Sequence, residues 1–168
     1  MKQLSLLKIR NDCTKDTVYY WKLFVDGASR NNPGPAGAGV FVLRDEKEFY
    51  KAGYFLGKKT NNQAEYLALL LGIFYIRKNM CPEDLIVIVS DSLLLVKQLK
   101  GEYRVKNGGL KPLYSLAKKL LEGLNVSLTH VLREENKEAD EQANNGVDHK
   151  HKVPQDFLDL LQSYDISI

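Results

Sequence analysis

Cysteine and long apolar runs are both scarce in this chain. Cys13 and Cys81 are the only cysteines among its 168 residues. They lack the spacing of a metal site, and such isolated cysteines are expected to be free thiols in a reducing compartment. Lys8 and Arg10 interrupt the N-terminal segment, which argues against a signal peptide. The longest apolar run, 66–76, is too short to span a bilayer, so we predict a cytoplasmic protein without membrane association.

The chain also has little excess charge of either sign. Its net charge is +3 at pH 7, so a uniformly basic surface cannot provide affinity for nucleic acid. Segment 97–119 nevertheless carries seven lysines and arginines against one acid, Glu102. Tyr103 and Tyr114 are interleaved with these basic residues, a pattern typical of a phosphate-binding strip. A solvated helix surface above two core tyrosines is an equal alternative.

The length and composition correspond to one globular domain, with 44% hydrophobic and 27% charged residues. Segment 30–39 is rich in glycine, proline and asparagine and is predicted to be a turn. Hydrophobic patterning predicts strands at 18–26, 40–44, 48–55, 85–89 and 126–132. It predicts helices at 62–78, 91–100, 111–121 and around 137–144, and then a polar link, 146–152, before an amphipathic tail, 154–161.

Four carboxylates stand where these patterns change. They are Asp26 after the first apolar run, Glu65 at the start of the apolar helix, Asp91 after the run 85–89, and Asp140 in the last helix. Residues so placed can converge on one edge of a sheet, where their charges repel unless cations neutralise them. Oxygen-only ligands suit Mg²⁺ or Mn²⁺, and a pair of such ions can cleave phosphodiesters. The pattern predicts a metal-dependent nuclease.

Each carboxylate also has a purely structural interpretation. Asp26 precedes a glycine, as in a hairpin turn. Asn62 and Glu65 have the spacing of a capping box, and Asp91 can cap the helix that follows it. Asp140 lies among several glutamates on what can be a solvated helix face. All four structural interpretations would have to be true at once to replace the nuclease hypothesis.

The order of elements and four motifs resemble ribonuclease H of type 1. The motifs are DGASRNNPGPAGAG, TNNQAEY, VSDS and HVLREENKEAD, and the resemblance covers about residues 18–148. It implies an α/β, ribonuclease H-like fold: a five-stranded mixed sheet flanked by helices. It divides the chain into an N-terminal extension (1–17), a ribonuclease H domain (18–148), and a C-terminal linker with a short helix (149–168).

The same resemblance implies a function and a cofactor. Members of this family cleave the RNA strand of RNA–DNA hybrids endonucleolytically and leave 3′-hydroxyl and 5′-phosphate ends. By similarity, Asp26, Glu65, Asp91 and Asp140 would bind two Mg²⁺ ions, with Mn²⁺ as a substitute. The hybrid is then the expected partner, and no obligate protein partner is evident.

The resemblance also indicates substrate-binding residues. Asn32, Asn62 and Gln63 match polar residues that contact the minor groove in the family, and amides can both donate to and accept from a 2′-hydroxyl. Asn32 can instead form a turn, and Asn62 can instead cap a helix. Ser92 is a weaker candidate for a sugar or phosphate contact. The candidates for phosphate contacts in the basic segment are Lys97, Lys100, Arg104 and Lys106.

The sequence departs from well-known family members in two places. Many carry a histidine on a mobile loop shortly before the last catalytic aspartate, whereas His130 falls within the last predicted strand and is expected to be structural. Arg133, seven residues before Asp140, is the candidate that binds the departing phosphate instead; its alternative is a surface ion pair with Glu134 or Glu135. A long basic protrusion is also missing, since only 102–110 separates the two middle helices.

Three other functions fit parts of this sequence. A 3′–5′ exonuclease on a similar sheet usually has Asp-x-Glu on its first strand, which the Asp-Gly-Ala at Asp26 does not supply. A transposase or integrase core normally brings further DNA-binding domains. A non-catalytic nucleic-acid-binding module would not need four intact carboxylates.

Overall fold

The computed structural model describes residue 13 and residues 16–168, and its central feature is a five-stranded mixed sheet in the order β3-β2-β1-β4-β5. The strands are β1 (Tyr20–Ser29), β2 (Gly34–Arg44), β3 (Lys47–Lys59), β4 (Leu85–Ser90) and β5 (Asn125–His130). β1, β2 and β3 pair antiparallel, whereas β4 runs parallel to both β1 and β5. The predicted fold class is therefore confirmed, including the parallel placement of the apolar run at 85–89.

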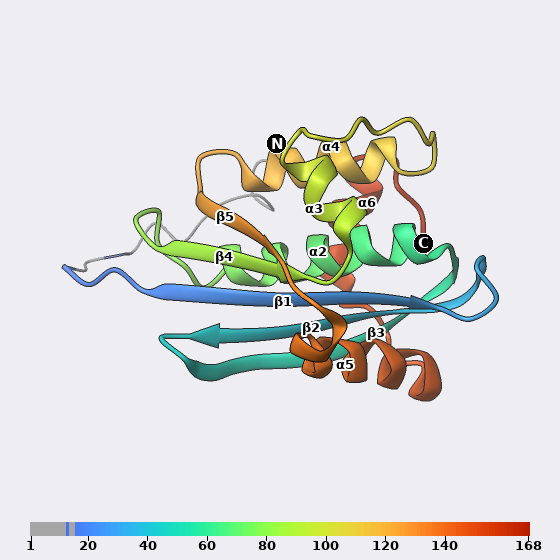
Figure 1. Cartoon of the computed structure of the whole chain (residues 1–168), viewed down its shortest axis with the longest axis horizontal. Helices are drawn as coiled ribbons and strands as arrows, with labels where there is room; N and C mark the ends of the chain where they lie inside the picture. The colour runs from blue at the N-terminus through green and yellow to red at the C-terminus, as the bar shows by residue number, and fades with distance from the viewer. Residues whose placement is uncertain (1–12, 14–15) are drawn as a thin grey trace.

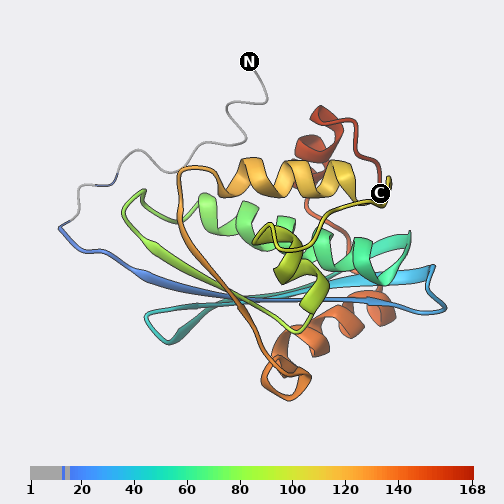
Figure 2. The ribbon, with the colours of Figure 1, turned by 45° about the horizontal axis from the view of Figure 1, so that its top comes forward.

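Helices cover both faces of the sheet. They are α2 (Asn61–Arg77), α3 (Leu93–Leu99), α4 (Lys111–Leu121), α5 (Lys137–His149) and α6 (Gln155–Ser163). Figure 1 shows α5 alone on one face, whereas α2, α3, α4 and α6 lie on the other. Figure 2 shows the same two layers after a 45° turn, with α4 running alongside α2. No helix in the part of the chain that the structure describes is long and apolar enough to cross a membrane.

The main core lies between α2 and the sheet. Trp21, Leu23 and Val25 alternate along β1 and are fully buried, as expected for a strand with one face against a helix. α2 is buried along nearly its whole length, as expected of a helix whose sequence is apolar nearly all round. α6 adds Phe157, Leu160 and Leu161 to this core, so the tail packs against the domain.

The predicted turn at 30–39 is largely wrong, because β2 already begins at Gly34. Two glycines of this segment, Gly37 and Gly39, serve close packing against α5. A Cβ added to Gly39 would lie 1.9 Å from the carbonyl oxygen of Ala139, and one added to Gly53 in β3 would lie 1.8 Å from that of Gln142. Only glycine permits the helix backbone to approach the sheet so closely.

The expectation of free thiols is also wrong, since Cys13 and Cys81 form a disulfide across a sequence separation of 68 residues. The bond ties residue 13 to the segment between α2 and β4. Local sequence gave no indication of it, because the two cysteines approach only when β1 and β4 pair. Near the same end of the sheet, the buried Asp84 accepts hydrogen bonds from Tyr19 N, Cys81 N and Trp21 Nε1, each 2.9 Å long.

The structure corrects two helix starts. The capping box of α2 consists of Thr60 and Gln63, so Asn62 and Glu65 do not form one. Ser92, one residue after Asp91, caps α3 by accepting a hydrogen bond from Leu95 N at 3.2 Å. Both Glu65 and Asp91 are thereby free of the capping roles that competed with the nuclease interpretation. α5 extends to His149, so the polar link begins later than predicted.

Candidate active site

A cavity of about 400 Å³ opens where β1 and β4 end, and it contains all four predicted carboxylates. Its walls come from β1 and the turn after it, the start of α2, the residue after β4, the 3₁₀ turn Arg133–Glu135, and α5. The lining residues are Asp26, Gly27, Ala28, Ser29, Arg30, Asn61, Glu65, Asp91, Arg133, Asp140 and Asn144. Segments far apart in the sequence thus contribute acids to one cavity.

Strand pairing and one close contact bring Asp26, Asp91 and Glu65 together. The parallel ladder between β1 and β4 ends at the pair Val25–Ser90, so Asp26 and Asp91 each follow the last paired residue of adjacent strands. A Cβ on Gly27 would lie 2.2 Å from the backbone nitrogen of Glu65, which shows how closely α2 approaches β1. The glycine after Asp26 therefore allows this close contact and does not form the predicted hairpin turn.

Asp26, Glu65 and Asp91 form a compact carboxylate cluster. One carboxylate oxygen from each lies within 4.8 Å of the others. Asp26 is 5% and Glu65 is 9% exposed. Oε2 of Glu65 is buried and has no hydrogen-bond partner among the described residues. An unpartnered buried oxygen costs free energy unless a ligand satisfies it.

The acids of the cluster hold protons more tightly than ordinary carboxyl groups. Burial, and then the charge of Asp91, raises the pKa of Asp26 from 3.8 to about 8. Burial, followed by the charges of Asp26 and Asp91, raises the pKa of Glu65 well above its usual range. A cation would reverse this effect by stabilising the ionised form. The crowded oxygen ligands and the unpartnered Oε2 of Glu65 therefore fit a hard divalent metal ion.

Asp140 lies in the same cavity but outside the three-acid cluster. Nη2 of Arg133 donates a hydrogen bond to its Oδ1 at 2.9 Å. This hydrogen bond raises the pKa of the Arg133 guanidinium above its usual value. The alternative pairing of Arg133 with Glu134 or Glu135 is not found in the described part of the chain; Glu135 instead accepts a hydrogen bond from Leu132 N at 3.2 Å.

His130 belongs to β5, as predicted; it is the last residue of the strand and is exposed. Its Nε2 lies 3.3 Å from the backbone carbonyl oxygen of Asp91, and it does not line the cavity. Of the two candidates, Arg133 is the one that lines the cavity and hydrogen-bonds to one of its carboxylates, that of Asp140.

Sequence patterns missed several residues of the site. Nη2 of Arg30, on the cavity wall, pairs with Oδ1 of Asp148 at 2.8 Å and lies 3.3 Å from Oδ1 of Asn144. Asn136 is completely buried, and its Nδ2 lies 2.9 Å from the carbonyl oxygen of Val25 and 3.3 Å from Oδ1 of Asp91. The sequence motifs contain both Arg30 and Asn136, but their contacts depend on residues that are distant in the chain.

The predicted minor-groove residues lie beside the cavity and not among its lining residues. Oδ1 of Asn32 accepts a hydrogen bond from the backbone nitrogen of Asn61 at 2.9 Å, which joins the turn after β1 to the start of α2. Asn62 is exposed, and Gln63 belongs to the capping box of α2. Ser92 is the cap of α3, so three of the four candidates already have a structural contact.

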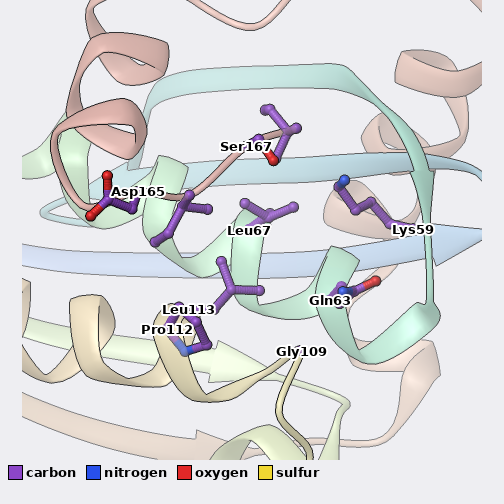
Figure 3. A pocket seen from close by; sticks show the side chains of 10 residues that line it. Lys59, Gln63, Leu67, Gly109, Pro112, Leu113, Asp165 and Ser167 are labelled. Carbon is purple, nitrogen blue, oxygen red and sulfur yellow. The ribbon is translucent and has the colours of Figure 1, made fainter.

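Gln63 also borders a second, smaller pocket of about 160 Å³ between α2, α4 and the C-terminal segment. Figure 3 shows Lys59, Gln63 and Leu67 facing Gly109, Pro112 and Leu113, with Asp165 and Ser167 nearby. This pocket is lined mainly by apolar groups near α4, and the carboxylate cluster does not border it.

The basic segment forms an open groove between α3 and α4, of about 660 Å³. Arg104 and Lys111 line it together with both tyrosines. Tyr103 is 48% exposed, whereas Tyr114 is partly buried and also packs against the core. Lys97 pairs with Glu102, and Lys100 and Lys106 are exposed. Tyr103 therefore faces solvent among basic residues, as a phosphate-binding strip predicts, and Tyr114 lines the same groove while it packs against the core.

Comparison with known proteins gives consistent matches. A family model described as reverse transcriptase-like matches residues 24–146. Ribonuclease HI of Halobacterium salinarum is 39% identical over 127 residues, which is 74% of this chain and 63% of that protein. The chain thus spans somewhat less than two thirds of that curated relative.

Solved structures share the fold over most of the chain. RNase H1 from Halobacterium salinarum superposes with a TM-score of 0.73 at 36% identity, covering 77% of this chain and 98% of the other. LC11-RNase H1, solved in complex with an RNA/DNA hybrid, has a TM-score of 0.71 at 29% identity, covering 78% and 97%.

Proposed function

The chain belongs to the type 1 ribonuclease H family, and from this premise we propose that it is a metal-dependent endoribonuclease that cleaves the RNA strand of RNA–DNA hybrids. The products would carry 3′-hydroxyl and 5′-phosphate ends. The observation that carries the proposal is the cluster of Asp26, Glu65 and Asp91, whose oxygens lie within 4.8 Å of one another in an open cavity. The hybrid bound to LC11-RNase H1, a structure of the same fold, supports the choice of substrate.

We propose that the carboxylates hold two Mg²⁺ ions, with Mn²⁺ as a substitute. Asp26, Glu65 and Asp91 would bind one ion, and Asp26 and Asp140 would bind the other. Such ions supply a water of lowered pKa and neutralise charge on the phosphodiester and the departing 3′-oxygen. Asp26 suits the shared position because it lies in a central strand of the sheet, between β2 and β4.

The two arginines of the cavity would then contact the substrate's phosphates. Arg133 would give up its hydrogen bond to Asp140 and bind the departing phosphate instead. Its planar guanidinium can donate two hydrogen bonds to one phosphate. The pKa of a guanidinium lies far above neutral pH, so Arg133 would act by charge and geometry and not by proton transfer. Arg30, held by Asp148 and Asn144, would contact a neighbouring phosphate of the cleaved strand.

Selectivity for hybrids would come from residues outside the cavity. We propose that Asn32, Asn62 and Gln63, at the start of α2, contact the minor groove, where 2′-hydroxyls distinguish RNA from DNA. Ser92 would contact sugar or phosphate beside Asp91. Phosphates of the hybrid would bind at the groove between α3 and α4, through Arg104 in the groove and through Lys97, Lys100 and Lys106 in the same basic segment, with Tyr103 as a stacking surface.

The cytoplasmic location, the lack of an obligate protein partner and the division at residues 17 and 148 remain parts of the same proposal. They follow from the sequence patterns and the family, except that the Cys13–Cys81 disulfide removes the support that free thiols gave to a cytoplasmic location.

A cleavage assay on an end-labelled hybrid tests the function. The RNA strand should be cut internally with Mg²⁺ or Mn²⁺ and remain intact with chelator, while duplex DNA, duplex RNA and single-stranded RNA should persist. Blocking both RNA ends should not prevent cleavage, since an endonuclease does not need them. Asp26→Asn should abolish the activity, and Asp159→Asn on the exposed face of α6 should not. Hybrid binding without cleavage by the wild-type protein would indicate a non-catalytic module.

A further inference from the structure

Asn136 occupies an unusual place between the elements that carry the acids. It lies between the 3₁₀ turn Arg133–Glu135 and α5, and its side chain is completely buried. An asparagine before a helix commonly accepts a hydrogen bond from the first turn of that helix. The side chain of Asn136 makes no such bond. Its amide is directed toward other elements instead.

The two contacts of this amide fix its orientation. Nδ2 donates to the carbonyl oxygen of Val25 at 2.9 Å and to Oδ1 of Asp91 at 3.3 Å. Both partners are acceptors, so only the nitrogen end of the amide can face them. The first contact falls on the residue before Asp26, at the point where the β1–β4 ladder ends. The second falls directly on a carboxylate of the cluster.

The backbone of Asn136 connects to the fourth acid. Its carbonyl oxygen accepts the first helical hydrogen bond of α5, from Asp140 N at 3.1 Å. One residue therefore contacts the strand that carries Asp26, the carboxylate of Asp91 and the helical turn that carries Asp140. Oδ1 of Asn136 is buried and has no partner among the described residues. An unpartnered buried oxygen lowers the stability of the fold. If Asn136 only filled space, an apolar side chain would do so without this loss.

We propose that Asn136 is a positioning residue for the metal site: its amide orients the carboxylate of Asp91 and sets the position of α5, and therefore of Asp140, relative to Asp26. It does not contact the substrate. Partners that orient ligands in this way change metal affinity or activity by about 10- to 100-fold when they are removed. The inference rests on the proposed function, because it concerns the same carboxylates.

The test compares Asn136→Ala and Asn136→Leu with the wild type. The alanine removes the amide, and the leucine keeps a similarly branched side chain without any hydrogen-bonding group. Both variants should bind Mn²⁺, measured by calorimetry without substrate, about 10- to 100-fold more weakly than the wild type. In hybrid cleavage kcat should fall by a similar factor while KM changes by less than about threefold, the split expected when substrate binding is untouched.

A matched control separates positioning from stability. Asn79 also donates an amide hydrogen bond to a backbone carbonyl, that of Tyr75 at 2.9 Å, but at the far end of α2. Asn79→Ala should lower resistance to urea without changing Mn²⁺ affinity or kcat. All proteins are compared at a temperature at which circular dichroism shows them folded, and Asn136→Ser, which keeps one donor, replaces the alanine if that variant does not fold.

The outcomes distinguish this inference from the proposed function. Hybrid cleavage by the wild type, together with Mn²⁺ affinity and kcat within about twofold of wild type in both Asn136 variants, would overturn the positioning role and leave the function intact. Weakened Mn²⁺ binding in the variants of a protein that does not cleave hybrids would support the positioning role and overturn the function.

Discussion

Substituting Asp26 should stabilise the metal-free protein in a pH-dependent manner. Burial and the charge of Asp91 raise the pKa of Asp26 from 3.8 to about 8 in the folded protein. A raised pKa means that the fold favours the protonated acid. The folded state therefore loses stability as the pH rises from about 4 to about 8, where Asp26 ionises in the unfolded chain but resists ionisation in the fold. Asp26→Asn removes this penalty.

The magnitude follows from the linkage relation. Each pH unit between the two pKa values costs about 1.4 kcal/mol, so Asp26 titrating alone would cost the wild type about 4 kcal/mol between pH 5 and pH 8. Glu65 and Asp91 share the same space, and the protons belong partly to the group as a whole. We therefore expect Asp26→Asn to be more stable than the wild type by about 2–4 kcal/mol at pH 8 and by less at pH 5.

Urea denaturation in the presence of EDTA, at pH 5, 6, 7 and 8, measures this difference. Asp159→Asn is the control, because it removes one negative charge from an exposed position. Saturating Mg²⁺ should reverse the order at pH 8, since only the wild type gains the full binding energy of the metal. An equal stability of Asp26→Asn and wild type at pH 8 without metal would refute the reasoning, because the crowding of the acids would then carry no cost.

Three further predictions follow from other contacts. The double variant Arg104→Ala and Lys106→Ala should raise KM for the hybrid and flatten its salt dependence while kcat stays nearly constant; a loss confined to kcat would contradict a phosphate-binding groove. Arg133→Ala should lower kcat more than it changes KM, with partial recovery in Arg133→Lys, and His130→Ala should retain most of the activity; the reverse pattern would assign the role to His130. Cys81→Ser should lower the free energy of unfolding by up to about 4 kcal/mol, the loop-entropy value for a separation of 68 residues, and should leave cleavage intact. An unchanged free energy of unfolding in this variant would show that the disulfide does not form in solution.

Local patterns sufficed for much of the fold. In the part of the chain that the structure describes, sequence patterning located the five strands and the α-helices, and the helix predicted at 111–121 has the observed bounds. The convergence of Asp26, Glu65 and Asp91 was also predictable, because each follows or begins an apolar element whose end meets one edge of the sheet.

What failed depended on partners far away in the chain. The local sequence of β2 is rich in glycine, which is typical of a turn. The reason for Gly37 and Gly39 is their packing against α5, which begins about a hundred residues later and is not visible in the local sequence. Asn136 contacts Val25 across 111 residues, and Arg30 contacts Asp148 across 118, so no local pattern marks either side chain. The pairing of Arg133 with Asp140 was missed for a different reason: the 3₁₀ turn directs the guanidinium away from its neighbouring glutamates.

The glycine contacts between α5 and the sheet have a consequence for protein engineering. Replacing glycine by alanine is a common way to stabilise a protein, because it restricts the unfolded chain. At Gly39 the new methyl group would meet the backbone of Ala139, one residue before Asp140. The helix would have to lift, and the distance between opposite walls of the cavity would widen with it. The absence of a side chain at Gly39 thus sets the distance between α5 and the sheet, and with it the distance between Asp140 and the other acids. A Gly39→Ala substitution made to stabilise the protein would change that distance and disturb the site.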